Sequence, residues 1–334
     1  MAPTLTSSPS VGLPGIARVG TAGRFRYRSS EGDWVVDPVL VDRIHRLAVP
    51  PAWTDVWISE QLGARVQATG RDARGRKQYR YSAAFRRARE ADKFSALTEF
   101  ARVLPRLRRA VQRDLRRRGL PREKVLATVV ALLEETRIRI GNREYAEANH
   151  SYGLTTLRPQ QVIVEGDIVR FVFRGKSGRR HRVMLEDHRL ARIVAQCRAV
   201  PGQDLFQYAA PDGTWVPIRS DDVNAYLRDV TRSDITAKEF RTWSASVLAL
   251  SLLRAGAEPA AVGRRSALGR AIQTVADELG NSPIVSRASY IHPRVISGYL
   301  TEGLAVVPTR RGMGWLSADE RRLVALLEQS ASAR

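Results

Sequence analysis

Hydrophobic and polar residues alternate over short stretches in the early part of the chain. Four segments there carry β-branched and aromatic residues in alternation, which indicates strands. A helical pattern interrupts them and stops at Pro50-Pro51. The predicted strands are FRYR (25–28), DVWIS (55–59), ARVQATG (64–70) and KQYRYS (77–82), and the predicted helix is VLVDRIHRLAV (39–49).

After roughly Phe94 the apolar residues recur at helical spacing instead. A long amphipathic stretch, 96–119, contains Pro105, which predicts a kink or a break between two helices. A second stretch, 123–141, stops near Gly141-Asn142. A β interruption follows in QVIVEG (161–166), DIVRFVFRG (167–175) and HRVML (181–185), and helices are expected from Glu186 to the end.

These patterns predict an α+β protein of two domains. The Ser/Pro/Gly-rich start predicts a disordered tail over 1–19 rather than a signal peptide. A small β-rich domain is expected over 20–95. A larger, mainly α domain with a small embedded sheet is expected over 96–334.

The charge balance narrows the class of partner. The 334 residues include 55 Lys+Arg against 34 Asp+Glu, a formal net charge of +21. Such a chain favours a polyanion, because each Lys or Arg that meets a phosphate releases counterions. Nucleic acid and anionic membrane both qualify, although no apolar run approaches the ~18 residues of a membrane span. A basic protein of ribosomal type is the ordinary alternative.

Metal and nucleotide chemistry find little support in the sequence. The only cysteine, Cys197, can form neither an intrachain disulfide nor a cysteine-based zinc site, and a single cysteine fits a reducing cytoplasm. Gly175-Lys176-Ser177 resembles the end of a phosphate-binding loop, but position 170 is Arg where that loop needs Gly, and the segment lies between two strands. The five histidines are scattered. We therefore expect neither a metal nor a cofactor.

Metal-free cleavage of a phosphodiester needs a nucleophile, positive charge on the non-bridging oxygens and an acid for the leaving oxygen. Arginine suits the second task, since its fork grips two oxygens and keeps its charge. The residues with suitable chemistry are Arg139 at a helix end, Lys176 at the tip of a hairpin, Arg241 with Lys238 one helical turn before it, and Tyr290. Taken singly, they can also be surface arginines, a turn lysine and a buried tyrosine. The residues alone leave a phosphoryl-transfer site and a basic DNA-binding protein equally open.

The order Arg, hairpin Lys, Lys-x-x-Arg and Ser-x-Ala-Ser-Tyr resembles the type IB DNA topoisomerases, particularly their bacterial and poxvirus-like branch. The resemblance extends from about Gly23 to Leu300. The matching segments are RIHRLAVPPAWTDVWI (43–58), QATGRDARGRKQYRY (67–81), RIRIGNREYAEANHSYGLTTLR (137–158), VRFVFRGKSG (169–178), TAKEFRTW (236–243) and LGNSPIVSRASYIHP (279–293).

The resemblance implies a role for each of these residues. Tyr290 is the expected nucleophile and forms a 3′-phosphotyrosyl bond. Arg139 and Arg241 are expected to clamp the scissile phosphate, and Lys176 to protonate the departing 5′ oxygen. Asn281 takes the place of a histidine that is usual in eukaryotic and viral members, and it can donate a hydrogen bond but carries no charge.

The resemblance also implies a partner and a mode of action. We expect a monomeric, bilobed clamp around duplex DNA that relaxes supercoils without ATP or metal and works in the cytoplasm on the nucleoid. Gln78 and Tyr79 match positions that touch bases in viral enzymes. An ordinary exposed strand is the alternative for this segment. The other expected DNA contacts are Arg71, Arg74, Lys77, Tyr145 and Lys238.

Two rival functions differ in their products. A tyrosine recombinase uses similar chemistry, but its helix motif usually reads His-x-x-Arg, whereas this chain has Lys238-x-x-Arg241. A non-catalytic DNA-binding protein would bind with a steep salt dependence and form no covalent adduct. The intact Arg–Lys–Arg–Tyr set argues against an inactive relative. His292, close to Tyr290, we interpret as structural.

Overall fold

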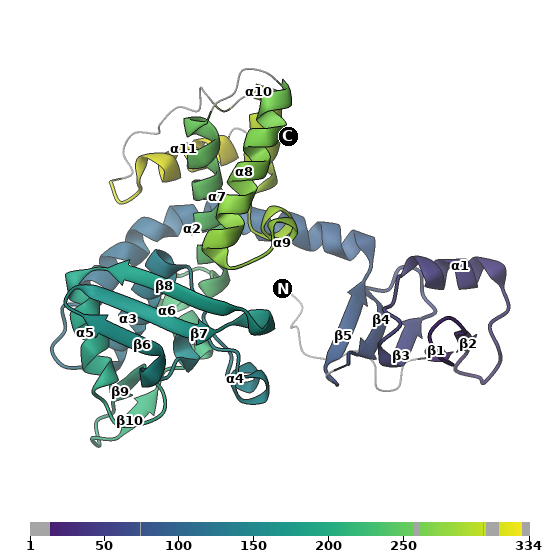
Figure 1. The fold of residues 1–334 in the computed structure, drawn as a ribbon, viewed down its shortest axis with the longest axis horizontal. Coiled ribbons are helices and arrows are strands. Elements are labelled where there is room, and N and C mark those ends of the chain that lie inside the picture. Colours follow the sequence, from purple (N-terminus) through teal and green to yellow (C-terminus); the bar gives the residue numbers. More distant parts are fainter. Residues whose placement is uncertain (1–13, 74, 257–260, 303, 305–313, 329–334) are drawn as a thin grey trace. The chain divides into compact units, whose positions relative to one another are not determined.

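The structure is a computed structural model that describes residues 14–73, 75–256, 261–302, 304 and 314–328 (Figure 1). The chain divides into two compact units, Met1–Lys93 and Phe94–Arg334. Within the described ranges, no helix has the length and apolar character that crossing a membrane requires.

The first unit is built on an antiparallel sheet with strand order β2-β1-β3-β4-β5. The four strands expected from the alternating pattern are all present, close to their expected positions. The strands are β1 (Gly15–Val19), β2 (Arg26–Arg28), β3 (Thr54–Ser59), β4 (Val66–Arg71) and β5 (Lys77–Tyr81).

The strand β1 corrects the expected tail over 1–19. Residues 15–19 pair with both β2 and β3, with Ile16 opposite Ile58. Ile16 is 1% exposed and belongs to the core of this unit. Burial of one apolar residue between two strands therefore outweighs the Ser/Pro/Gly-rich composition that surrounds it. Residues 1–13 lie outside the described part of the chain.

Helix α1 (Pro38–Arg46) begins where the sequence provides a cap. The Asp37 carboxylate accepts a hydrogen bond from the Val39 amide at 2.9 Å, and Pro38 occupies the first helical position, where its missing N–H is no loss. The helix buries Ile44 against the sheet residues Val56 and Ile58. The first unit thus has a small core of its own.

The second unit is mainly helical, with three short strands in one sheet and two in another. Its helices are α2 (Ala83–Asp114, which begins in the first unit), α3 (Arg122–Thr136), α4 (Arg143–Asn149), α5 (His188–Arg198), α6 (Ser220–Thr231), α7 (Ala237–Ala255), α8 (Ala261–Leu279), α9 (Pro283–Ser289), α10 (Pro293–Glu302) and α11 (Ala318–Glu328). The strands are β6 (Val162–Glu165), β7 (Ile168–Arg174), β8 (Arg180–Glu186), β9 (Gln207–Ala209) and β10 (Trp215–Pro217).

Helix α2 differs from its expected form in two ways. It begins at Ala83, well before Phe94, and the Ser82 hydroxyl accepts a hydrogen bond from the Phe85 amide at its start. It also continues through Pro105 without a break. Leu104 and Leu107, on either side of the proline, are both buried in the same core. Their packing keeps the helix continuous despite the backbone hydrogen bond that proline cannot make.

Two other expectations from the sequence need correction. Helix α3 ends at Thr136 rather than near Gly141, because Arg137 adopts a left-handed conformation with φ of 56°. A two-stranded hairpin, β9 with β10, interrupts the region after Glu186 that the sequence predicts as helical throughout. Strands of three residues are too short to produce a recognisable alternation.

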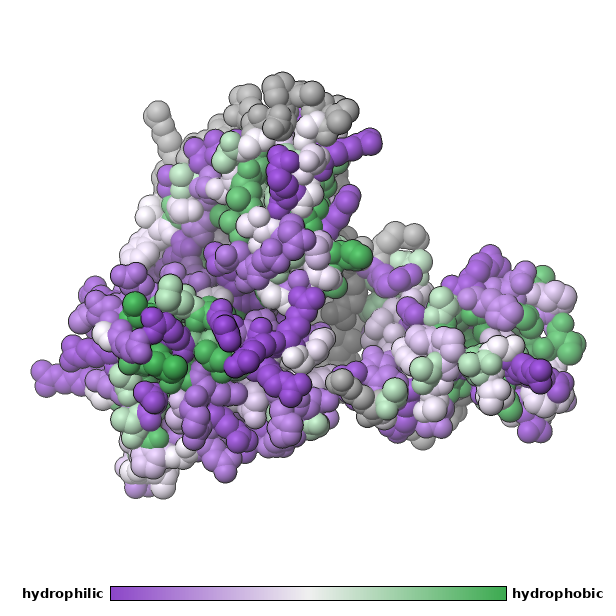
Figure 2. All heavy atoms as spheres, viewed as in Figure 1, coloured by the Kyte–Doolittle hydropathy of each residue, from purple (hydrophilic) through white to green (hydrophobic). Residues whose placement is uncertain are grey.

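The embedded sheet has the order β6-β7-β8, as the predicted hairpin requires. Helices α3 and α5 pack against it (Figure 1). Alternate residues of β7, namely Val169, Phe171 and Phe173, are buried in the core of the unit. Figure 2 shows that hydrophilic side chains cover most of the visible face of this unit, with smaller hydrophobic patches between them.

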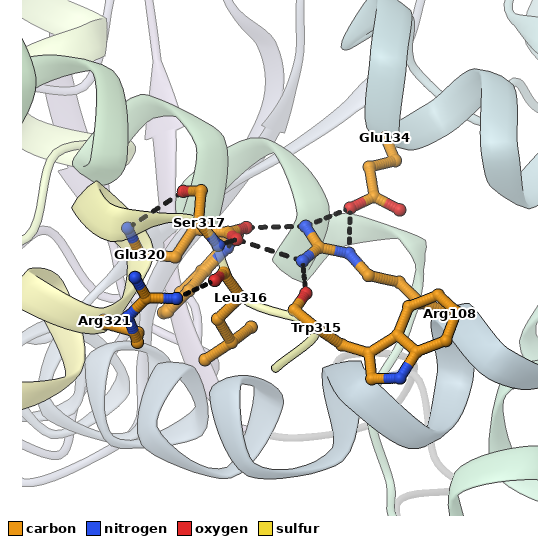
Figure 3. Close-up of polar contacts among 8 residues, drawn as sticks. Arg108, Glu134, Trp315, Leu316, Ser317, Glu320 and Arg321 are labelled. Carbon is orange, nitrogen blue, oxygen red and sulfur yellow. Dashed lines mark hydrogen bonds and ion pairs between the residues drawn. The ribbon is translucent and has the colours of Figure 1, made fainter. Parts of the chain in front are cut away.

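A partly buried ion-pair network connects α11 to α2 and α3 (Figure 3). The Arg108 guanidinium donates hydrogen bonds to Glu134 at 2.5 Å, to Glu320 at 2.6 Å and to the Trp315 carbonyl oxygen. The Trp243 indole on α7 donates a further bond to Glu320 at 3.0 Å. Glu320 is 6% exposed, so its charge depends on these partners. The network therefore holds α11 against α2, α3 and α7.

Replacing Arg108 with alanine is expected to destabilise the second unit by about 3–5 kcal/mol, because it leaves the buried Glu320 carboxylate and the half-buried Glu134 carboxylate without their cation. Thermal or urea unfolding followed by circular dichroism measures the effect. Arg102→Ala is the control, since Arg102 is on the same helix and pairs with Glu99 in solvent. That variant should unfold almost like the wild type. Equal stability of the two variants would contradict the structural role of the network.

Candidate active site

Arg139 lies in the segment that follows α3 and is fixed there by close backbone contacts. Its carbonyl oxygen accepts a hydrogen bond from the Leu154 amide at 2.9 Å, and the Ile140 carbonyl accepts one from Thr155 at 2.8 Å. A β-carbon on Gly153 would lie 2.5 Å from the Arg139 carbonyl oxygen. Only glycine allows the two segments to approach so closely. The backbone of Arg139 is thereby held in one place.

Arg241 is on the first half of α7. A capping box sets the start of this helix, since the Thr236 amide and hydroxyl both donate to the Glu239 carboxylate at 2.7 Å. Arg241 is 5% exposed. It donates to the Leu279 carbonyl at 2.8 Å and to the Arg137 carbonyl. These carbonyl oxygens fix the orientation of the guanidinium, but they carry no formal charge and so do not neutralise it.

Tyr290 caps the end of α9. Helix α9 begins at Pro283, and Ser282 caps it by accepting a hydrogen bond from the Val285 amide. At its end the Tyr290 amide donates to the Ser286 carbonyl at 3.0 Å. The Ser246 hydroxyl on α7 lies 3.2 Å from the Tyr290 carbonyl and accepts a hydrogen bond from the His292 amide at 2.9 Å. The tyrosine is thus attached to the helix that carries Arg241.

The Arg139 guanidinium connects two of the predicted site residues. One of its terminal nitrogens donates to the Tyr290 hydroxyl at 2.8 Å, and the other donates to the Asn281 side-chain oxygen at 2.9 Å. The Tyr290 ring also lies against both arginines, with the guanidinium carbons of Arg139 and Arg241 at 5.8 and 5.2 Å from the ring centroid. The structure therefore brings together four of the predicted residues.

Electrostatics in this cluster favour the phenolate form of Tyr290. Burial acts to raise the pKa of the tyrosine hydroxyl, but the charges and hydrogen bonds of Arg139 and Arg241 outweigh it, and the pKa is lowered. Burial and the neighbouring Arg139 lower the pKa of Arg241 to about 10, which leaves it protonated at neutral pH. Two cations thus stand beside a phenol that they help to deprotonate.

Two donors in the cluster lack a partner within the part of the chain that the structure describes. They are Nε of Arg241 and Nδ2 of Asn281, and both are buried. A buried donor without an acceptor costs about 1–3 kcal/mol, so such groups call for an explanation. Both belong to residues that the family resemblance implies as contacts of the scissile phosphate. An anion between them would supply the missing acceptors.

Lys176 is the fifth predicted catalytic residue. It lies in a short 3-10 turn, Lys176–Gly178, between β7 and β8, and its side chain is exposed at the tip of the hairpin. It lines one cavity of about 260 Å³ together with Arg139, Arg241 and Tyr290. Tyr145 and Lys238, expected to contact DNA, are exposed and line the same cavity.

The other expected DNA contacts are in the first unit. Arg71, Lys77, Gln78 and Tyr79 are on β4 and β5, with Arg71 opposite Lys77 in the register. Arg71 pairs with Asp55 at 3.4 Å, and Gln78 donates to Asp72 at 3.0 Å. Arg74 lies outside the described residues.

His292 has a structural environment. It is 9% exposed, and its ring meets Phe94 edge-on at a centroid distance of 4.9 Å. Its Nδ1 accepts a hydrogen bond from the Arg294 amide, and burial lowers the pKa of the ring to about 4.

Tyr152 also lines the cavity and was not predicted from the sequence. Its amide donates to the Arg174 carbonyl at 2.7 Å, which connects its segment to the hairpin. The sequence signal for it was only its place in the motif 137–158. The described residues include no group of three or more His, Cys, Asp or Glu side chains that could hold a metal ion.

Comparisons with known proteins identify the family of the chain. The model of the eukaryotic DNA topoisomerase I catalytic core matches residues 82–302, and the model of the bacterial DNA topoisomerase IB N-terminal domain matches residues 24–72. A DNA topoisomerase 1B of Acanthamoeba polyphaga mimivirus is 28% identical over 287 residues, which cover 84% of this chain and 85% of the relative. The DNA topoisomerase 1B of vaccinia virus (strain Copenhagen) is 20% identical over 260 residues, which cover 76% and 80%.

The protein is thus a DNA-cleaving and rejoining enzyme of the isomerase class, with an N-terminal domain of the bacterial type. Because the catalytic-core model matches more than half of the chain, the chain belongs to the type IB DNA topoisomerases. It relaxes DNA through transient cleavage of a single strand. The α+β fold, the family and the activity predicted from the sequence are all confirmed.

Proposed function

We propose that Tyr290 is the nucleophile of this enzyme and that it forms a 3′-phosphotyrosyl bond with one strand of duplex DNA. The observation that carries the proposal is the 2.8 Å hydrogen bond between Arg139 and the Tyr290 hydroxyl. The two arginines that lower the pKa of this phenol also offer positive charge to the phosphate it would attack.

The cleavage step follows from these groups. The Tyr290 oxygen attacks the phosphorus, and its proton passes to solvent. The bond between phosphorus and the 5′ oxygen breaks as the bond to tyrosine forms. Arg139 and Arg241 neutralise the charge that builds on the non-bridging oxygens, while Asn281 donates a hydrogen bond to one of them. Lys176 gives its proton to the departing 5′ oxygen. Rejoining runs the same steps in reverse.

This exchange needs no ATP. A DNA phosphodiester is replaced by a phosphotyrosyl ester, so the energy of the broken bond is conserved in the covalent protein–DNA link. The arginines and the lysine supply the positive charge and the proton that a metal ion supplies in other phosphodiester-cleaving enzymes. We therefore propose that the reaction requires neither ATP nor metal.

We further propose that the enzyme acts as a monomeric clamp on duplex DNA in the cytoplasm, at the nucleoid. In this proposal the β-rich domain over 20–95 and the helical domain over 96–334 both bind the duplex. Gln78 and Tyr79 are suited to contact bases. The residues proposed to contact the phosphate backbone are Arg71, Arg74, Lys77, Tyr145 and Lys238.

Relaxation of a supercoiled plasmid in EDTA, without ATP, tests the proposed chemistry. The expected result is a ladder of topoisomers that ends in relaxed circles. Restored activity on adding Mg²⁺ or ATP to an enzyme that is inactive in EDTA would contradict it. Strand exchange between two DNA circles, rather than relaxation, would indicate a recombinase.

Lys176→Ala provides a separate test of the acid. The variant is expected to form the covalent adduct about 10²–10⁴ times more slowly on ordinary DNA, since that is the usual contribution of a general acid. On DNA with sulfur in place of the bridging 5′ oxygen at a mapped cleavage site, the loss should be much smaller, because a thiolate leaves without a proton. Equal slowing on both substrates would remove Lys176 from the acid role.

A further inference from the structure

His181 lies on β8, directly opposite Phe173 of β7 in the register. Its ring stacks on the Phe173 ring, with an interplanar angle of 9° and a centroid distance of 5.1 Å. It is half-buried and lines a small cavity with Arg139, Lys176 and Arg241. The ring therefore lies on one face of the hairpin that carries Lys176, and this face lines a cavity next to the proposed active-site residues.

The His181 ring fills the space beside two glycines from different parts of the chain. A β-carbon on Gly175 would lie 2.6 Å from both Cδ2 and Nε2 of the ring. One on Gly280 would lie 2.9 Å from Nδ1 and closer still to Cε1. Real β-carbons do not approach other atoms so closely, so the ring is in direct contact with both backbones. Gly175 precedes Lys176, and Gly280 precedes Asn281.

The hairpin tip has backbone bonds of its own, but they act within the turn. The Gly175 amide donates to the Arg179 carbonyl at 2.7 Å, and the Gly178 amide donates to the Gly175 carbonyl at 3.0 Å. These bonds set the shape of the turn. They do not set its distance from the segment around Asn281 and Tyr290, whereas the imidazole touches both sides.

The His181 ring also suits this position because it is uncharged at physiological pH. Burial and the nearby Arg241, Arg139 and Arg179 all lower the pKa of His181. A flat side chain that is neutral at physiological pH can fill this gap without adding a further positive charge to the arginines. A lysine or arginine there would be repelled by them.

We propose that His181 is a positioning residue that holds the Lys176 hairpin against the Gly280–Asn281 segment, and so places the acid over the leaving 5′ oxygen. The proposal rests on the proposed roles of Lys176 and Tyr290. It assigns no proton transfer to the imidazole itself. Its consequence is that removing the ring should damage the acid step more than any other step.

The test is the rate of covalent adduct formation by His181→Ala in a single turnover, at a mapped cleavage site. On ordinary DNA the rate should fall about 10²-fold, the usual cost of displacing a reacting group by about 1 Å. With sulfur as the leaving atom the rate should return to within about threefold of wild type, because that substrate needs no acid. Added to Lys176→Ala, the change should cost little more, since both act on one step.

Gly175→Ala disturbs the same contact from the hairpin backbone instead of from the ring. It is a second variant in case His181→Ala fails to fold. Its backbone is extended, with φ of −101°, so alanine is allowed there, but the new methyl group would displace the ring. The same pattern of loss and recovery is expected. His188→Ala is the control, since this histidine is exposed at the start of α5 and pairs with Asp167. It should cleave both substrates like the wild type.

Two results would overturn the inference. One is cleavage of ordinary DNA by His181→Ala at nearly the wild-type rate. The other is equal slowing on both substrates while Lys176→Ala is still rescued by sulfur, which would make the ring merely structural. If sulfur rescues neither variant, the proposed acid role of Lys176 fails first. Thermal unfolding of each variant shows whether a loss of activity reflects loss of the fold.

Discussion

Tyr290→Phe is expected to abolish plasmid relaxation and the covalent protein–DNA adduct while leaving DNA binding nearly intact. Phenylalanine retains the ring that lies against Arg139 and Arg241 but removes the oxygen that would attack phosphorus. One hydrogen bond contributes about 0.5–1.5 kcal/mol, so the affinity for DNA should change by less than about tenfold. Adduct formation on a labelled duplex in a denaturing gel measures the first effect, and a binding titration measures the second.

The matched control is Tyr208→Phe, since Tyr208 is on β9 and does not line the cavity. It should relax plasmid at the wild-type rate. An adduct formed by Tyr290→Phe would show that another residue is the nucleophile. Loss of non-covalent binding together with activity would indicate instead that the tyrosine maintains the site's structure.

Arg139→Lys is expected to slow adduct formation by about 10²–10³-fold, the usual cost of removing one donor from a charged transition state. Lysine keeps the positive charge but loses the planar fork. In the structure the two ends of that fork reach Tyr290 and Asn281 at 2.8 and 2.9 Å. A single ammonium group cannot hold both, so the phenol and the amide lose their common anchor.

Single-turnover cleavage at saturating enzyme separates this loss from weaker binding. Arg143→Lys is the comparison, because Arg143 is exposed on α4 and pairs with Glu147 one helical turn later. It should cleave like the wild type. Equal rates for Arg139→Lys and the wild type would show that charge alone suffices and that the fork is not used.

The sequence could supply candidate residues for the site because side chains of suitable chemistry lie in short motifs. Lys176 was a candidate because alternating strands predict a hairpin around Gly175-Lys176-Ser177, and Tyr290 because it lies in the segment 282–293, which ends at Pro293. The hydrophobic periodicity of the sequence did not predict that these residues lie close together in the fold. Arg139 and Tyr290 are 151 residues apart in the chain, and only the resemblance to a family joined them in advance.

What the sequence could not provide was the burial and the packing around each residue. Arg241 is one of many arginines, and its near-complete burial depends on carbonyls contributed by Arg137 and Leu279. His181 looked like an ordinary residue of a strand, since its contacts are with glycines, which leave no pattern of their own. The strand β1 and the uninterrupted helix through Pro105 likewise depend on core contacts from distant segments.

The most direct test of the central claim is to map the residue that carries DNA. The enzyme is trapped on a duplex labelled on the 5′ side of the break, the DNA is trimmed with nuclease, and the modified peptide is identified by mass spectrometry. The account predicts a single nucleotide-bearing peptide, SPIVSRASYIHP or a fragment of it, modified at Tyr290 through a 3′ phosphate. Modification at any other residue, or a link through a 5′ phosphate, would contradict it.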